Sequence, residues 1–372
     1  MSFVCETRPR GHASPAETFL HQHVPNYPLS SNCDDGVIVR FQRRTALTLG
    51  TEHTRHVYAE VVPKLAMQHK YLLHAVLATT ILHDRALAGL SQSTTTESYH
   101  VSHAASLFNQ KLSSTIADED RDALWATAVY LCAMAVFNVD ISDPENAWPL
   151  RPSHPTDLEW LNMQAGLRVI WNVAQINRTG GLFAHVESES KPNCVYPELP
   201  KAGITGISQI LVDLCDTTQG STTSNDPYHT AVGYLSWLLP MKGDPANILT
   251  FMVFAGGMTK DFRRLLHEKD SRALLILAIW YSKLFHSSWW VSPRARLECD
   301  AICRYLTRLD TRHQAFQIVL NVVRMACERR DSQAAAILLE EPRIISGFVK
   351  QERRQDLLPD RPTSKQVDMF WM

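Results

Sequence analysis

Glycine is scarce in this chain, and neither a long apolar run nor a repeat of fixed period is present. The 372 residues include only 15 glycines, and long stretches are rich in helix formers with few breakers. The missing repeat gives no support to a solenoid built from helical hairpins. The hydrophobic fraction of 45% is ample for a buried core. The composition therefore predicts an all-α globular protein, and we expect no β-sheet of any size.

An excess of charge of either sign is also missing. Lys and Arg together number 37 against 38 Asp and Glu, so the balance gives no electrostatic reason to expect direct nucleic-acid binding. Apolar runs such as Ala273 to Tyr281 fall far short of the roughly 20 residues that cross a bilayer. The residues after Met1 do not form the basic start and apolar segment of a secretory signal. We expect no membrane span and a location in the nucleus and/or cytoplasm.

The signatures of several common enzyme and metal sites do not occur. The Gly-x-Ser-x-Gly, Walker and dinucleotide motifs are missing, so no cofactor is predicted. Two His-x2-His pairs, at His53 and His100, have ligand-like spacing but no clear third ligand. Cys299 and Cys303 lie four residues apart, but two thiols do not make a structural zinc site, and the scattered cysteines are interpreted as small core residues. The acidic run at 118–122 is interpreted as the start of a helix, and no metal is predicted.

The chain divides into three segments by composition. Residues 1–36 mix Pro, His, Ser and Asn without an apolar period, which is typical of a flexible leader. Residues 37–340 have helical periodicity and are predicted to form a single compact multi-helix domain. Residues 341–372 are charged and are predicted to form a loosely docked tail. Prolines between 144 and 155 mark a break between helices rather than a domain boundary.

The clearest predicted helix is the segment from Leu72 to Leu82, where apolar residues recur at three- and four-residue steps. Ala75 and Ala78 in this segment allow a neighbouring helix to approach closely. We therefore expect it to lie in the centre of the core. Further helices are predicted at 117–138, 157–177, 204–215, 228–239, 243–254, 257–267, 270–287, 292–309 and 312–328.

Three blocks of the sequence resemble the regulatory domain of fungal zinc-cluster transcription factors of the sterol-uptake-control type. The most specific is VPKLAMQHKYLLHAVLA at 62–78, followed by Leu82 and His83. The other blocks are RFQRRTALTL at 40–49 and a segment that begins at MTKDF (258–262), continues through RALLILA (272–278) and ends at Trp289 and Trp290. The resemblance covers roughly residues 37 to 310. It implies a compact all-helical domain with an apolar internal pocket for a small molecule such as a sterol.

The sequence departs from that family at the DNA-binding module. A zinc cluster needs six cysteines in two C-x2-C-x6-C halves, and no CxxC occurs in this sequence. The leading hypothesis is therefore a regulator of fungal secondary metabolism that senses an apolar ligand, a sterol, terpenoid or polyketide, or that acts through a protein partner. Two alternatives stay open. One is a cofactor-free cyclase, dehydratase or isomerase of a polyketide or terpenoid intermediate on the same scaffold, and the other is a remnant that acts only as an interaction partner.

Two groups of residues are candidates for a site. His74 and His83 lie in the signature helix, where a buried neutral histidine is the ordinary interpretation and an acid/base role requires a cavity that opens there. A cluster of aromatic residues is the candidate ligand wall, because aromatics supply contact area and a polar handle. Core packing without a ligand is the competing interpretation of this cluster, which consists of Trp280, Tyr281, Phe285, Trp289 and Trp290.

Overall fold

A computed structural model describes residues 32–49, 55–90, 92–139, 143–183, 197, 199–309 and 313–329. Within these residues the chain is helical, and the only β pairing is an isolated bridge between Ala202 and Thr222. The prediction of an all-α fold is therefore confirmed. None of the helices described combines the length and apolar character that a bilayer crossing needs. Most of the predicted leader and the whole predicted tail at 341–372 lie outside the described residues.

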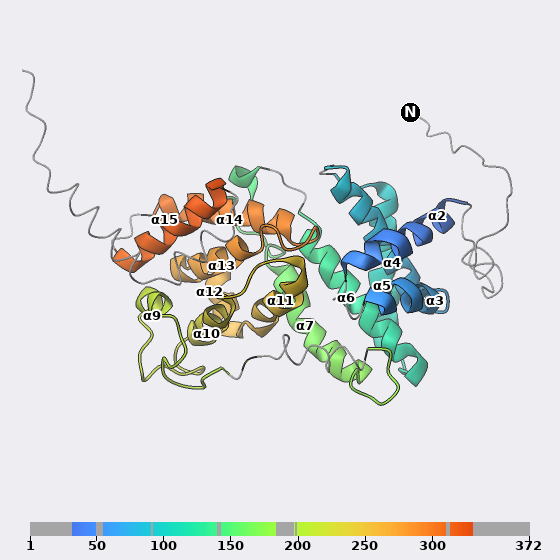
Figure 1. The fold of residues 1–372 in the computed structure, drawn as a ribbon, viewed down its shortest axis with the longest axis horizontal. Helices are drawn as coiled ribbons and strands as arrows, with labels where there is room; N and C mark the ends of the chain where they lie inside the picture. The colour runs from blue at the N-terminus through green and yellow to red at the C-terminus, as the bar shows by residue number, and fades with distance from the viewer. Residues whose placement is uncertain are drawn as a thin grey trace, which may run out of the picture.

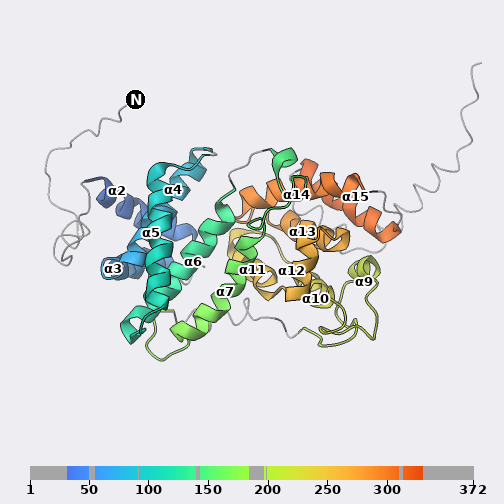
Figure 2. The same cartoon turned by 180° about the vertical axis from the view of Figure 1, so that it is seen from behind.

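The helices form two groups joined by α6 and α7 (Figures 1 and 2). Helix α4 packs on α5 and α6 in the first group, and α13 packs on α14 and α15 in the second. The principal elements are α2 (Asn32–Arg40), α3 (Val62–Ala66), α4 (Lys70–Leu87), α5 (Thr95–Leu112), α6 (Arg121–Phe137), α7 (Glu159–Ala174), α9 (Gln209–Cys215), α10 (His229–Leu238), α11 (Ile248–Gly257), α12 (Lys260–His267), α13 (Ser271–Lys283), α14 (Ser292–Thr307) and α15 (Gln314–Arg329). Short π-helical or 3-10 turns are η1 (Phe41–Thr45), η2 (Ala46–Thr48), η3 (Val57–Val61), η4 (Asp118–Asp120), η5 (Pro144–Asn146) and η6 (Pro245–Asn247).

Helix α4 is the central element of the first group, as the spacing of its apolar residues predicts. Its side chains are buried nearly all round, because α3, α5 and α6 surround it. Thr79 and Thr80 are buried without loss of hydrogen bonding, since each hydroxyl donates to the carbonyl four residues earlier. Arg85 forms a two-point ion pair with Glu97, both at 2.9 Å, which joins the end of α4 to the start of α5.

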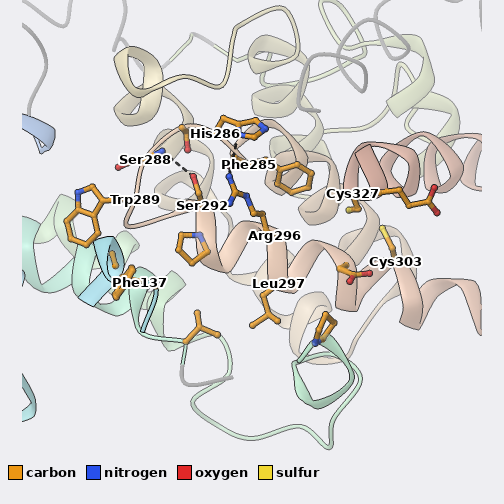
Figure 3. Close-up of a pocket in the computed structure, with 18 of the residues that line it drawn as sticks. Phe137, Phe285, His286, Ser288, Trp289, Ser292, Arg296, Leu297, Cys303 and Cys327 are labelled. Carbon is orange, nitrogen blue, oxygen red and sulfur yellow. Dashed lines mark hydrogen bonds between the residues drawn. The ribbon is translucent and has the colours of Figure 1, made fainter. Parts of the chain in front are cut away.

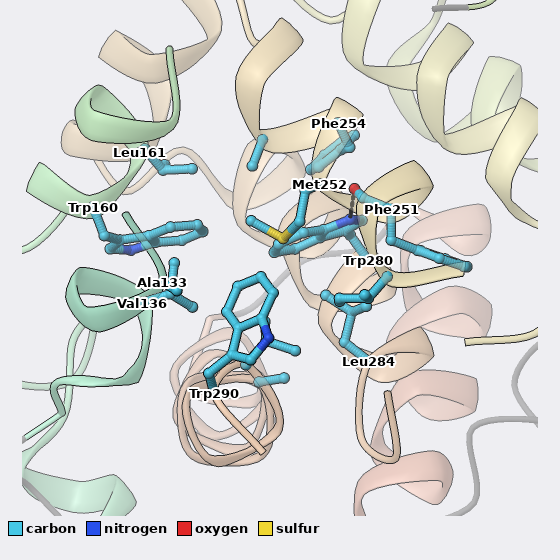
Figure 4. Packing of buried hydrophobic residues seen from close by; sticks show 14 of the residues in the cluster. Ala133, Val136, Trp160, Leu161, Phe251, Met252, Phe254, Trp280, Leu284 and Trp290 are labelled. Carbon is cyan, nitrogen blue, oxygen red and sulfur yellow. Dashed lines mark hydrogen bonds between the residues drawn. The ribbon is translucent and has the colours of Figure 1, made fainter. Parts of the chain in front are cut away.

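Helix α13 is the central element of the second group. Asp270 caps it by accepting a hydrogen bond of 2.9 Å from the Ala273 amide. The run from Ala273 to Tyr281 is buried on every side. Figure 4 shows Trp280 of this helix facing Trp160 of α7 and Trp290 of the turn before α14. This apolar run, which is too short to cross a membrane, therefore forms the helix around which the second group packs.

Some helix starts differ from the predictions, and local capping explains one of them. The helix predicted at 243–254 begins at Ile248, because the Asp244 side chain accepts from the Asn247 amide and η6 occupies the intervening residues. At the N-terminal end, α2 begins at Asn32, inside the segment predicted as leader. The division into leader, domain and tail stays a prediction.

We predict that Gly243→Ala destabilises the fold by about 3 kcal/mol. A β-carbon at Gly243 would lie 1.5 Å from the carbonyl oxygen of Lys283 in α13, and a backbone oxygen cannot rotate away. Urea unfolding followed by circular dichroism measures the loss. The matched control is Gly166→Ala in α7, where a β-carbon meets nothing within 4 Å. This control is expected to stabilise by about 0.5 to 1 kcal/mol, since alanine is the better helix former. Equal stability of the two variants would contradict the prediction.

Candidate functional site

A groove with a volume of about 1410 Å³ lies where the two groups of helices meet. The ends of α4 and α6 line one side, and α14, α15 and the turn between α13 and α14 line the other. Figure 3 shows Trp289 and Phe137 near one end of the groove and Cys303 and Cys327 near the other. Leu87 and Leu90 at the rim are each 62% exposed.

Trp289 is the best-anchored aromatic residue of the groove. Its ring stacks on His83 with centroids 4.5 Å apart and planes 12° apart, and it meets Phe137 edge-on at 5.4 Å. The indole N–H donates to the Thr48 hydroxyl at 2.9 Å. A side chain held by three partners presents a rigid surface to an occupant. Two residues singled out separately in the sequence, His83 and Trp289, are thus brought together.

His83 itself is buried behind Trp289 and does not line the groove. Burial and the neighbouring Arg44 lower its pKa to about 4, although Asp84 opposes the shift. Its Nδ1 atom lies 3.1 Å from the Thr45 hydroxyl. A neutral, hydrogen-bonded ring is the state that this environment favours, so the geometry supports a packing role for His83.

His74 lies on another face of α4, away from the groove. Its Nδ1 atom is 2.9 Å from Nδ1 of His100 in α5, and the ring of His103 is 5.2 Å away between centroids. Burial, with His100 and His103 next in effect, lowers the pKa of His74 to about 4. Two Nδ1 atoms at this distance share one hydrogen, so at least one ring has an unprotonated Nδ1. The acid/base role considered for His74 and His83 stays untested.

The five aromatics predicted as a ligand wall divide between the groove and the closed core. Phe285 and Trp289 line the groove. Trp280, Tyr281 and Trp290 are buried and are not among the groove residues. Trp280 stacks between Trp160 at 6.1 Å and Phe254 at 5.4 Å, which leaves it in core packing.

A buried ion pair, which the sequence did not indicate, connects α14 with the end of α6. Arg294 and Glu298 pair on one face of α14, and the Tyr281 hydroxyl donates to the Glu298 carboxylate at 2.5 Å. Arg294 also donates to the last carbonyls of α6, at 2.8 Å for Val136. Burial raises the pKa of Glu298, and Arg294 opposes that shift. The Arg-x3-Glu spacing in the sequence is compatible with such a pair, but the same spacing is usual on exposed helix faces and so does not predict a buried pair.

Charged side chains also line the groove. The groove is lined by five arginines and two carboxylates. Arg304 and Arg308 of α14 both bind Glu145 of η5, at 3.1 and 2.8 Å. Hydrogen bonds from Arg308 and Arg304 lower the pKa of Glu145. The lining therefore combines aromatic side chains with arginines, most of which are paired with carboxylates. The apolar internal pocket expected from the sequence stays a prediction.

The acidic residues at 118–122 form hydrogen bonds and ion pairs around the start of α6, which agrees with their interpretation as the start of a helix. The Asp120 carboxylate accepts from the Ala117 amide at 2.9 Å and pairs with Lys111. Asp122 pairs with Arg178 after α7. Cys299 and Cys303 are buried core residues, as expected. A third cysteine, Cys327, lies beside them, which the sequence did not indicate.

Comparison with known proteins gives one family match. Residues 42–148 match the model of the fungal specific transcription factor domain. No curated protein matches the chain. The matched residues include most of η1, all of η2 to η5 and α3 to α6, and they supply the α4 and α6 side of the groove. The resemblance inferred from the signature helix is therefore confirmed over this segment. The similarity of residues 42–148 to the fungal specific transcription factor domain supports a transcription-regulator-like role for the protein.

Proposed function

We propose that this protein is a transcription regulator whose groove binds an amphipathic small molecule. One observation carries the proposal. The groove is lined on one side by the fungal transcription factor segment and on the other by α14 and α15. Ligand sites occur preferentially between structural units. An occupant of this groove contacts both units at once.

The lining supports a particular class of ligand. Phe137 and Trp289 offer an apolar surface at one end, which suits the skeleton of a sterol, terpenoid or polyketide. The arginines that α14 and α15 contribute to the lining suit a carboxylate or another oxygen-rich group. We therefore propose a ligand with an apolar body and an acidic end, such as an intermediate or product of fungal secondary metabolism.

The position of the groove supports a way for the ligand to act. A ligand shifts an equilibrium between two arrangements only by its difference in affinity for them. An occupant that bridges α4 and α14 binds best when these helices lie at one particular separation, so it favours that arrangement. We propose that the altered surface is recognised by a protein partner in the nucleus, and that partner connects the response to transcription.

Binding is tested with 8-anilinonaphthalene-1-sulfonate, which has an apolar aromatic body and an anionic group like the proposed ligand. Leu87→Glu combined with Leu90→Glu adds negative charge at the rim and removes two apolar contacts. We expect about tenfold weaker binding of the probe, the equivalent of about 1.4 kcal/mol. Fluorescence titration measures the change. Equal binding by the wild type and the double variant would contradict the location of the site.

The matched control is Val169→Glu on α7. Val169 is 61% exposed, almost the same as the two leucines, and it does not line the groove. The control is expected to bind the probe like the wild type.

In the fungus, deletion of the gene is expected to change transcripts of a metabolic gene set, with rescue by the control and not by the groove variant. Unchanged transcripts with accumulation of one unconverted intermediate would contradict the regulator and favour the cofactor-free enzyme.

A further inference from the structure

Three cysteine thiols meet at the wall of the groove, between α14 and α15. Cys299 and Cys303 are four residues apart on α14 and so lie on the same face of that helix. Cys327 of α15 packs opposite them, with its sulfur 3.2 Å from that of Cys299. All three sulfur atoms lie within 4.8 Å of one another.

The spacing of these sulfurs fits one shared metal ion. A metal–sulfur bond of about 2.3 Å places three sulfurs in a trigonal plane about 4 Å apart. The thiols therefore need little movement to close around an ion. Two other free cysteines of the described chain, Cys132 and Cys215, are buried elsewhere and belong to no such group.

We propose that Cys299, Cys303 and Cys327 form a binding site for a thiophilic metal ion, with monovalent copper as the ion that fits best. Thiolates are soft ligands and select soft ions. Within the described residues, no histidine or carboxylate joins the group as a fourth ligand. A structural zinc site is ordinarily four-coordinate, whereas three thiolates satisfy monovalent copper.

Hydrogen bonds fix two of the three sulfur atoms. The Cys327 thiol donates to the Cys299 sulfur at 3.2 Å, and the Cys299 thiol donates to the carbonyl of Ala278 in α13 at 3.4 Å. The contact between the two helices is therefore held in place beside Cys303.

Binding would be a simple exchange of protons for the ion. Three copper–sulfur bonds form, the protons still held by the thiols leave to solvent, and copper stays monovalent, so no oxidant or reductant is consumed. The resulting complex has a net negative charge. Arg304 and Arg324 line the same groove, where they pair with Asp300 and Glu328.

The ion has access from the groove. Cys303 and Cys327 are among the groove residues (Figure 3). Cys299 is fully buried and does not line the groove. An ion can therefore enter from solvent without opening the core. The same position would place the ion in the wall of the proposed ligand groove, but the site depends only on the three thiols and not on the proposed function.

The test is an anaerobic titration of the reduced full chain with Cu(I), in competition with a chelator that forms a coloured copper complex. We expect the wild type to retain one high-affinity equivalent, with a thiolate-to-copper absorption band in the ultraviolet. Cys327→Ser changes the partly exposed member and is expected to lower the affinity at least 100-fold. Cys215→Ser is the matched control, because this buried thiol lies outside the cluster, and it is expected to bind like the wild type.

Three results would overturn the proposal. One is that Cys327→Ser and Cys303→Ser both retain copper with the affinity of the wild type. Another is cysteine-dependent binding of Zn(II) without binding of Cu(I), which would reject copper as the ion. The last is a Cys299–Cys327 disulfide in the protein isolated from cells, shown by a mass two hydrogens lower, because a disulfide cannot hold the ion. Folding of each variant is checked by circular dichroism, and a misfolded Cys327→Ser is replaced by Cys327→Ala.

Discussion

Arg294→Met is expected to lower the free energy of unfolding by about 3 to 5 kcal/mol. The substitution removes the hydrogen bonds that the guanidinium donates to the end of α6. It also leaves the Glu298 carboxylate buried without its cationic partner, with the Tyr281 hydroxyl as its remaining hydrogen-bond donor. An unpaired buried charge costs far more than an exposed one, because water no longer solvates it. Urea unfolding followed by circular dichroism measures the difference.

The matched control is Arg264→Met in α12. Arg264 also pairs with a glutamate four residues later, Glu268, but both side chains are more than half exposed. This control is expected to change stability by less than about 0.5 kcal/mol. The double variant Arg294→Met with Glu298→Leu is expected to recover part of the loss, because no buried charge is then unpaired. A loss below about 1 kcal/mol for the single variant would show that the pair is not the link between the two helix groups.

Acidification from pH 7.5 to 5 is expected to destabilise the folded chain by about 2 kcal/mol for each of His74 and His83. Burial lowers both pKa values from 6.5 to about 4. Between these values the unfolded chain binds more protons than the folded chain, so stability falls as the pH decreases. Chemical unfolding at a series of pH values measures the slope.

The histidine variants separate this effect from general acid denaturation. His83→Gln is expected to remove about 2 kcal/mol of the pH dependence over the same range, since the titrating group is lost. The control is His267→Gln, on an exposed position of α12, and it is expected to keep the wild-type slope. A wild-type slope in His83→Gln would contradict the assignment.

The elements that could be predicted from the sequence are those whose information is local. Helix α4 was predicted because Leu72, Leu73, Val76 and Leu77 repeat at helical spacing, and α13 followed from its apolar run. The predicted start of α11 at residue 243 was too early, because hydrophobic periodicity carries no information about the cap that Asp244 forms. Periodicity reports which residues are buried but not which neighbour buries them.

The candidate site was predictable only in fragments. Trp289 and His83 were each noted, yet nothing in the chain order places them in contact, because they come from separate helix groups. Cys299 and Cys303 were noted as adjacent, but Cys327 was absent from that reasoning because it comes from the next helix. The five predicted aromatics divided between groove and core because Trp280 and Tyr281 lie on the buried helix α13, whereas Phe285 and Trp289 lie in the turn after it.

The sequence by itself determined the all-α class, the two core helices and the kinship of residues 42–148, because each depends on residue type and on spacing within one segment. Only the tertiary structure decided the groove between α4 and α14, the buried pair of Arg294 with Glu298, and the meeting of three thiols. These features arise where helices distant in the chain pack together. Helix crossing geometry, which no single segment encodes, sets which of their side chains meet.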